Sequence, residues 1–170
     1  FSCDNENISN NENTNTNPQT TYGVTKNLGE CVPNKNFIVI RLPLLFGPTN
    51  KNQIVKKLIE NVKNNKIISV SNDVITTPVY TPFVANWIIN NVIQNEKSPI
   101  LIHLCSDKYL SMYEFMTLIL KKNNLDNLIK SVSSDIFPAS EPKPKNGGLS
   151  SIYHDGFSIE LMVNEYLKVI

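Results

Sequence analysis

The sequence has 170 residues, of which 41% are hydrophobic and 18% charged, a composition typical of a globular protein with a sizeable core. The net charge is +1 and Arg41 is the only arginine among 16 basic residues, which excludes a broad nucleic-acid-binding surface. No run approaches the roughly 20 apolar residues of a membrane span. Cys3, Cys31 and Cys105 form neither a CxxC pair nor a disulfide framework. This predicts free thiols in a cytoplasmic protein, with no metal site.

The first part of the chain predicts a loop, a helix and a strand. Residues 4–18 are rich in Asn, Thr and Glu and lack periodicity, which predicts a surface loop. A helix is expected over residues 20–30, directly after Pro18. Residues 37–41 (FIVIR) are continuously apolar and β-branched up to Arg41, which is typical of a strand buried in a parallel sheet.

The middle of the chain continues this alternation. Apolar residues at Ile54, Leu58 and Val62 predict an amphipathic helix over residues 52–64. The segments that follow are a strand over 67–71, an extended segment over 79–81, a helix over 83–93 with Trp87 on its buried side, and a buried strand over 100–104 in which His103 is expected to be a core histidine.

The last part of the chain carries a clear helix start. Ser111 and Glu114 have the spacing of a capping box, so a helix is expected to begin at Ser111. A short strand over 131–134, a Pro/Lys/Gly-rich loop over 136–150 and a final helix over 157–168 complete the prediction. Strands that alternate with helices predict an α/β fold with a mainly parallel sheet.

Tyr22 and Lys26 are the first residues with a possible catalytic role. They are separated by four positions in the predicted helix and therefore share one of its faces. A positive charge beside a phenol favours the phenolate, so the pair is suited to general acid–base catalysis. In a keto reductase, the phenol would protonate the carbonyl oxygen. A chance Tyr and Lys on an exposed helix face is the alternative in so Lys-rich a chain.

Four separated segments carry a resemblance to a known family. They are NPQTTYGVTKNLGE with the following FIVIRLPLLFGP, then VSNDVITTPVYTPFVANWI, IHLCSDKYLSMYEFMTLIL and FPASEPKPKNGGLSS. Their order and content resemble the extended short-chain dehydrogenase/reductases and, more narrowly, the dTDP-4-dehydrorhamnose reductase (RmlD-type) family. The resemblance implies a Rossmann-like fold with a small substrate-binding region. It also implies NADP(H) or NAD as cofactor and reduction of a dTDP-4-keto-6-deoxy sugar.

The same resemblance implies roles for individual residues. Tyr22 would be the catalytic acid–base, and Lys26 would contact the nicotinamide ribose and favour ionisation of Tyr22. Ser2 and Cys3 stand where the family has its Ser-Thr pair, so a weakly hydrogen-bonding thiol replaces the threonine hydroxyl.

Further residues would line the cofactor and substrate sites by resemblance. Arg41 and Pro43 would lie near the cofactor, although a structural ion pair is an open alternative for Arg41. Leu44 stands in place of an aromatic residue at the sugar site, Lys143 in place of an arginine, and Asn146 would close the substrate pocket.

The resemblance also implies how the chain is organised. Residues 1–170 are expected to form one domain, the C-terminal portion of such a protein without its glycine-rich phosphate loop, and a homodimer is possible. The segment RLPLLFG, from Arg41 to Gly47, is similar to the regulatory β subunit of methionine adenosyltransferase. A non-catalytic NADP-binding subunit that partners that enzyme is therefore the alternative function, and an inactive fragment is a third.

Overall fold

The structure is a computed structural model that describes residues 10–31, 37–48, 53–94, 100–138 and 144–170. Its helices are α1 (Thr21–Glu30), α2 (Ile54–Lys63), α3 (Thr81–Ile88), α4 (Met112–Lys121) and α5 (Ile159–Leu167), with a π-helical turn η1 (Ile89–Ile93) and 3-10 turns η2 (Asp126–Leu128) and η3 (Ser134–Ile136). Its strands are β1 (Val39–Arg41), β2 (Leu45–Phe46), β3 (Ile68–Ser71), β4 (Ile75–Thr76), β5 (Val79–Tyr80), β6 (Leu101–His103), β7 (Leu110–Ser111) and β8 (Ile129–Val132).

The strands form pairs that are mainly parallel. β1 pairs with β6, β2 with β5 and β3 with β8, all parallel, whereas β4 and β7 are antiparallel. In the first pair Arg41 lies opposite His103. Parallel partners far apart in sequence need crossover connections, and helices supply them here. The predicted α/β class with a mainly parallel sheet is therefore confirmed.

Local sequence signals explain where the helices begin. The Thr20 hydroxyl accepts a 3.0 Å hydrogen bond from the N–H of Gly23 and caps α1. Ser111 and Glu114 form the predicted capping box, since each side chain bonds the other's backbone N–H. Ser158 caps α5 in the same way as Thr20 caps α1.

Three predictions about element bounds were wrong in detail. The helix expected over 83–93 begins at Thr81 and changes to π-helical geometry at Ile89, because Pro82 fits the first turn of a helix. Consequently the extended segment ends at Tyr80. The strand expected over 131–134 is β8, Ile129–Val132, because its register with β3 fixes it two residues earlier.

The part of the predicted loop over 4–18 that the structure describes has no helix or strand beyond a single bridge at Asn10, but it is tied closely to the sheet. Asn10 is buried, forms a parallel bridge with Leu149 and donates a 3.2 Å hydrogen bond to the carbonyl of Gly148. Glu12 bonds the backbone of His103. A polar segment can pack this tightly because its side chains satisfy backbone groups at the end of the sheet.

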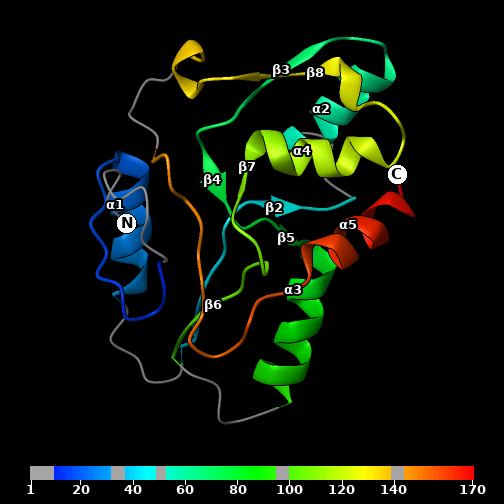
Figure 1. The fold of residues 1–170 in the computed structure, drawn as a ribbon. Helices are drawn as coiled ribbons and strands as arrows, with labels where there is room; N and C mark the ends of the chain where they lie inside the picture. The colour runs from blue at the N-terminus through cyan, green and yellow to red at the C-terminus, as the bar shows by residue number, and fades with distance from the viewer. Residues whose placement is uncertain (1–9, 32–36, 49–52, 95–99, 139–143) are drawn as a thin grey trace.

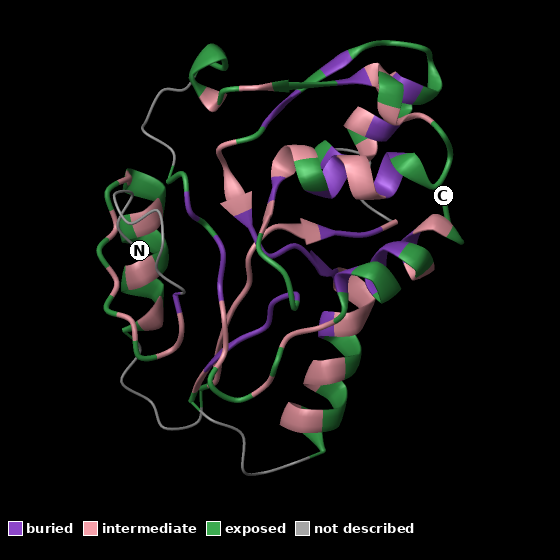
Figure 2. Ribbon diagram, in the orientation of Figure 1, coloured by how far each residue is buried: buried purple, intermediate pink, exposed green. Residues whose placement is uncertain are grey.

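The core lies on one side of the molecule, where α2, α4 and α5 cover the strands (Figure 1). Phe46 is fully buried at its centre, with ring centroids 5.3 Å from Tyr80, 5.1 Å from Phe115 and 5.4 Å from Tyr166. By contrast, α1 lies at the left of the view, away from this cluster, and has no buried residue (Figure 2). Within the described residues, no helix has the length and apolar character needed to cross a membrane.

Candidate active site

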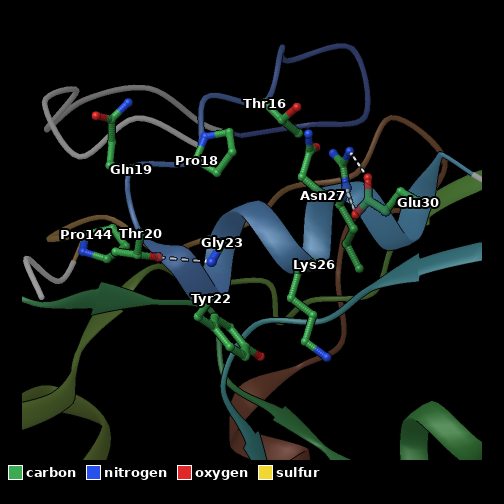
Figure 3. Close-up of a pocket in the computed structure, with 11 residues that line it drawn as sticks. Thr16, Pro18, Gln19, Thr20, Tyr22, Gly23, Lys26, Asn27, Glu30 and Pro144 are labelled. Carbon is green, nitrogen blue, oxygen red and sulfur yellow. Dashed lines mark hydrogen bonds and ion pairs between the residues drawn. The ribbon is translucent and has the colours of Figure 1, made fainter.

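Helix α1 presents Tyr22 and Lys26 together, as their spacing predicts. The Lys26 ammonium lies 5.5 Å from the centroid of the Tyr22 ring, within range of a cation–π interaction. Both side chains leave the helix on the same side (Figure 3). Tyr22 is 70% exposed. Among the described residues, neither its hydroxyl nor the ammonium has a hydrogen-bond partner, so both are available to a ligand.

A pocket of about 370 Å³ lies against this helix. Its lining comes from the segment before α1, from α1 itself, from the end of β1 and from the C-terminal loop: Thr16, Pro18, Gln19, Thr20, Tyr22, Gly23, Lys26, Asn27, Glu30, Arg41 and Pro144 (Figure 3). A cavity of this volume can hold part of a small-molecule ligand. Tyr22, Lys26 and Arg41, all predicted site residues, are thus brought to one pocket.

Arg41 is held by an acidic partner at the end of α1. Its Nε and Nη2 donate to the two carboxylate oxygens of Glu30 at 2.9 and 2.7 Å, a bidentate pair. Its Nη1 lies 3.2 Å from Nε2 of His103 on the neighbouring strand. The structural interpretation of Arg41 as an ion pair is therefore confirmed, and its contact with a cofactor stays a prediction.

His103 is fully buried, as expected for a core histidine, and is surrounded by polar groups. Its Nδ1 lies 3.1 Å from the carbonyl oxygen of Asn10 and 2.9 Å from that of Ser150. Because both neighbours are acceptors, Nδ1 carries the proton and Nε2 accepts from Arg41. Burial lowers the pKa of His103, although the charge of Glu12 opposes this effect.

Glu12 joins the N-terminal segment to the same region. Its carboxylate accepts from the backbone N–H of His103 at 2.8 Å, the hydroxyl of Ser151 at 2.6 Å and the N–H of Ile152 at 2.9 Å. Burial alone would raise the pKa of Glu12, but these hydrogen bonds outweigh it and the pKa lies below its ordinary value. The carboxylate thus stays ionised and fixes two distant segments to β6.

The loop that precedes α5 is anchored by Asp73. The carboxylate of Asp73 pairs with Lys145 at 3.3 Å and accepts from the backbone N–H of Ser134 at 2.8 Å and the hydroxyls of Ser133 and Ser134. Although burial acts in the opposite direction, these bonds lower the pKa of Asp73 to about 2. This anchor fixes Lys145, the residue after Pro144, and Pro144 itself lines the pocket.

The remaining predicted site residues lie elsewhere or outside the described ranges. Asn146 is buried, and its Oδ1 accepts a 3.1 Å hydrogen bond from Gly148 N–H. Leu44 packs against the hydrophobic core, and Pro43 precedes it between β1 and β2. None of these three is among the pocket residues. Ser2, Cys3 and Lys143 fall outside the residues that the structure describes.

Two acidic residues of the site were missed by the sequence prediction. Glu30 follows Lys26 by four positions, as Lys26 follows Tyr22, so the helical spacing that pairs the first two residues also points to the third. No comparable signal marks Glu12, because its partners are 91 and 139 residues away along the chain.

Comparisons with known proteins place these features in context. A family model described as the RmlD substrate binding domain matches residues 1–158. The spore coat polysaccharide biosynthesis protein SpsK of Bacillus subtilis is 28% identical over 136 residues, which is 78% of this chain and 47% of SpsK. The chain therefore spans about half the length of this curated relative.

Solved structures show the same fold. A dTDP-4-dehydrorhamnose reductase from Yersinia enterocolitica matches with a TM-score of 0.84 and 23% identity over 96% of this chain and 61% of that one. The corresponding reductase from Bacillus anthracis, solved in complex with NADP, matches with a TM-score of 0.84 and 25% identity over 95% of this chain and 60% of that one. The Rossmann-like α/β class is thereby confirmed.

Proposed function

The chain belongs to the RmlD substrate-binding domain family, and from this we propose that it is the substrate-binding part of a nucleotide-sugar oxidoreductase. The reaction we propose is reduction of the 4-keto group of a dTDP-4-keto-6-deoxy sugar such as dTDP-4-dehydrorhamnose. The observation that carries the proposal is the Tyr22–Lys26 pair, which lies at a pocket in a chain of this family and whose hydroxyl and ammonium have no hydrogen-bond partner among the described residues.

In this proposal, Tyr22 supplies the proton. Its hydroxyl donates to the carbonyl oxygen of the substrate, which becomes an alcohol. Once Tyr22 has given up its proton, Lys26 stabilises the resulting phenolate, because the Lys26 ammonium lies over the Tyr22 ring. The 70% exposure of Tyr22 leaves its ring accessible to a bound sugar.

The pocket residues also fit a nicotinamide cofactor, NADP(H) or NAD. Within the part of the chain that the structure describes, the ammonium of Lys26 has no hydrogen-bond partner, so it can donate to the hydroxyls of a ribose. When bound, the cofactor supplies the hydride for the reduction. We propose that a glycine-rich segment elsewhere in the gene product holds its pyrophosphate, and that residues 1–170 act as one substrate-binding unit. The reductase structures, which are longer than this chain, support the proposal.

The comparisons do not favour the alternative function, a regulatory subunit of methionine adenosyltransferase. The relatives described above are reductases and a polysaccharide biosynthesis protein. The segment on which the alternative rests, Arg41 to Gly47, contains β2 and contributes to the core: Phe46 is fully buried and Leu44 packs against the same cluster. Its apolar character therefore has a structural explanation.

NADPH consumption by the full gene product tests the proposal. The substrate is dTDP-4-dehydrorhamnose, and dTDP-glucose, which lacks the keto group, is the control. We expect NADPH to be oxidised with the first compound only and a dTDP-linked 6-deoxy sugar to accumulate in equal amount. Absence of turnover from a folded, NADPH-binding protein would contradict the proposed reaction.

A further inference from the structure

Helix α1 carries the proposed catalytic pair but has little apolar attachment to the rest of the molecule. None of its residues is buried, and Val24 and Leu28 are exposed. Figure 2 shows only intermediate and exposed residues along it. Most helices in proteins are held by an apolar face packed on a core. Other contacts must therefore fix the position of α1 relative to the strands.

The Glu30 carboxylate supplies such a contact at the last residue of the helix. Both of its oxygens bond the guanidinium of Arg41, and the two side chains are only 26% and 15% exposed, respectively. A bidentate pair that is partly shielded from water fixes orientation as well as distance. An exposed pair of flexible side chains does much less. The end of α1 is thus tied to the end of β1.

Arg41 is in turn fixed from the strand side. His103, opposite it in the β1–β6 register, accepts from Nη1 through Nε2. The ring cannot rotate freely, because Nδ1–H lies between the carbonyls of Asn10 and Ser150. A continuous set of hydrogen bonds therefore runs from Glu30 through Arg41 to a histidine buried in the sheet.

We propose that Glu30 and Arg41 are positioning residues that orient α1, and with it Tyr22 and Lys26, over the pocket. Tyr22, Lys26 and Glu30 follow one another at intervals of four along the helix, so the anchor lies about two turns from the reacting phenol. Neither anchoring residue needs to touch the reacting atoms. This inference rests on the proposed function for its catalytic consequence, but the attachment of α1 can be measured without any substrate.

The test compares Glu30→Gln with the matched variant Glu165→Gln in the full gene product. Glu165 forms an exposed ion pair with Lys168 on α5, so its loss provides a control for removal of one carboxylate. We expect hydrogen exchange of the α1 amides to become about tenfold faster in Glu30→Gln, with the global unfolding midpoint near that of the control. We also expect kcat to fall about tenfold or more while KM for the nucleotide sugar changes little, because a small displacement of catalytic groups lowers kcat strongly.

Arg41→Lys provides a second variant. A lysine keeps the positive charge but lacks the planar fork with which Arg41 bonds both carboxylate oxygens and the His103 ring, so its kcat and exchange should lie between those of wild type and Glu30→Gln. This graded order distinguishes geometry from charge alone.

Each result decides the inference. If Glu30→Gln matches Glu165→Gln in both exchange and kcat, or if exchange accelerates without loss of kcat, the positioning role is overturned. If the wild-type protein turns over no substrate, the proposed function fails separately. The exchange measurement then decides whether the pair anchors α1: faster exchange supports the anchor and unchanged exchange overturns it.

Discussion

The carboxylate of Glu12 accepts a 2.8 Å hydrogen bond from the backbone N–H of His103, 91 residues further along the chain. The same side chain bonds Ser151 and Ile152, so one residue of an Asn-rich segment joins β6 to the stretch before α5. This segment leads directly into the residues that line the pocket and cap α1. The N-terminal segment is therefore part of the site's framework.

Replacement of Glu12 by glutamine should destabilise the protein by about 1–3 kcal/mol. A glutamine has only one acceptor oxygen, so its NH2 group must replace one of the two carboxylate oxygens. The NH2 group would then face either the N–H of Ile152 or the N–H of His103 and the hydroxyl of Ser151, and the donors it faces lose their acceptor. Urea unfolding measures the effect, with Asp155→Asn at an exposed position as control. Equal stability of Glu12→Gln and the control would show that the carboxylate has no anchoring role.

Asp73 should make stability depend on pH in the acid range. Its pKa is about 2 in the folded protein against an ordinary value of 3.8, so the folded state favours the ionised form. The stabilisation is present above pH 3.8 and is lost as the pH falls towards about 2. Asp73→Asn should be less stable than wild type at neutral pH, and the difference should shrink across this window. Unfolding midpoints measured from neutral to acid pH check this, and a constant difference would contradict it.

Two substitutions in the aromatic core should change the stability of the protein in opposite directions. Phe46→Ala removes a fully buried ring in contact with three others and should cost about 3–5 kcal/mol. Tyr166→Phe keeps the ring but removes a buried hydroxyl that has no hydrogen-bond partner within the described part of the chain. Its stability should equal or exceed that of wild type by up to about 1 kcal/mol. A large loss in Tyr166→Phe, measured by urea unfolding, would reveal a partner for the hydroxyl.

Much of the fold follows from short-range signals in the sequence. The capping box at Ser111 and the apolar periodicity of α2 are local features, and the structure confirms them. The cap that Thr20 provides for α1 is local as well, although the helix was expected to include Thr20. The two-residue strands β2, β4 and β7 could not be predicted, because so short a strand has no periodicity of its own and exists only through its partner.

In the site, too, only the contacts within one helix could be predicted from the sequence. The i, i+4 spacing places Tyr22 and Lys26 together, and this is a property of one helix. The contacts of Glu12, of Asp73 with Lys145 and of Arg41 with His103 join segments far apart in sequence, and the last of them is set by the register of β1 with β6. Without an observed register, the partner of each charge could not be chosen.

The most direct test of the proposed activity is the rate of NADPH oxidation by Tyr22→Phe with dTDP-4-dehydrorhamnose. Tyr153→Phe is the matched control, since Tyr153 is also an exposed tyrosine and lies outside the pocket lining. We expect kcat to fall about a hundredfold to ten-thousandfold in Tyr22→Phe, with unchanged stability, and to stay at the wild-type value in Tyr153→Phe. A Tyr22→Phe protein that turns over as fast as wild type would contradict the assignment of Tyr22 as the proton donor.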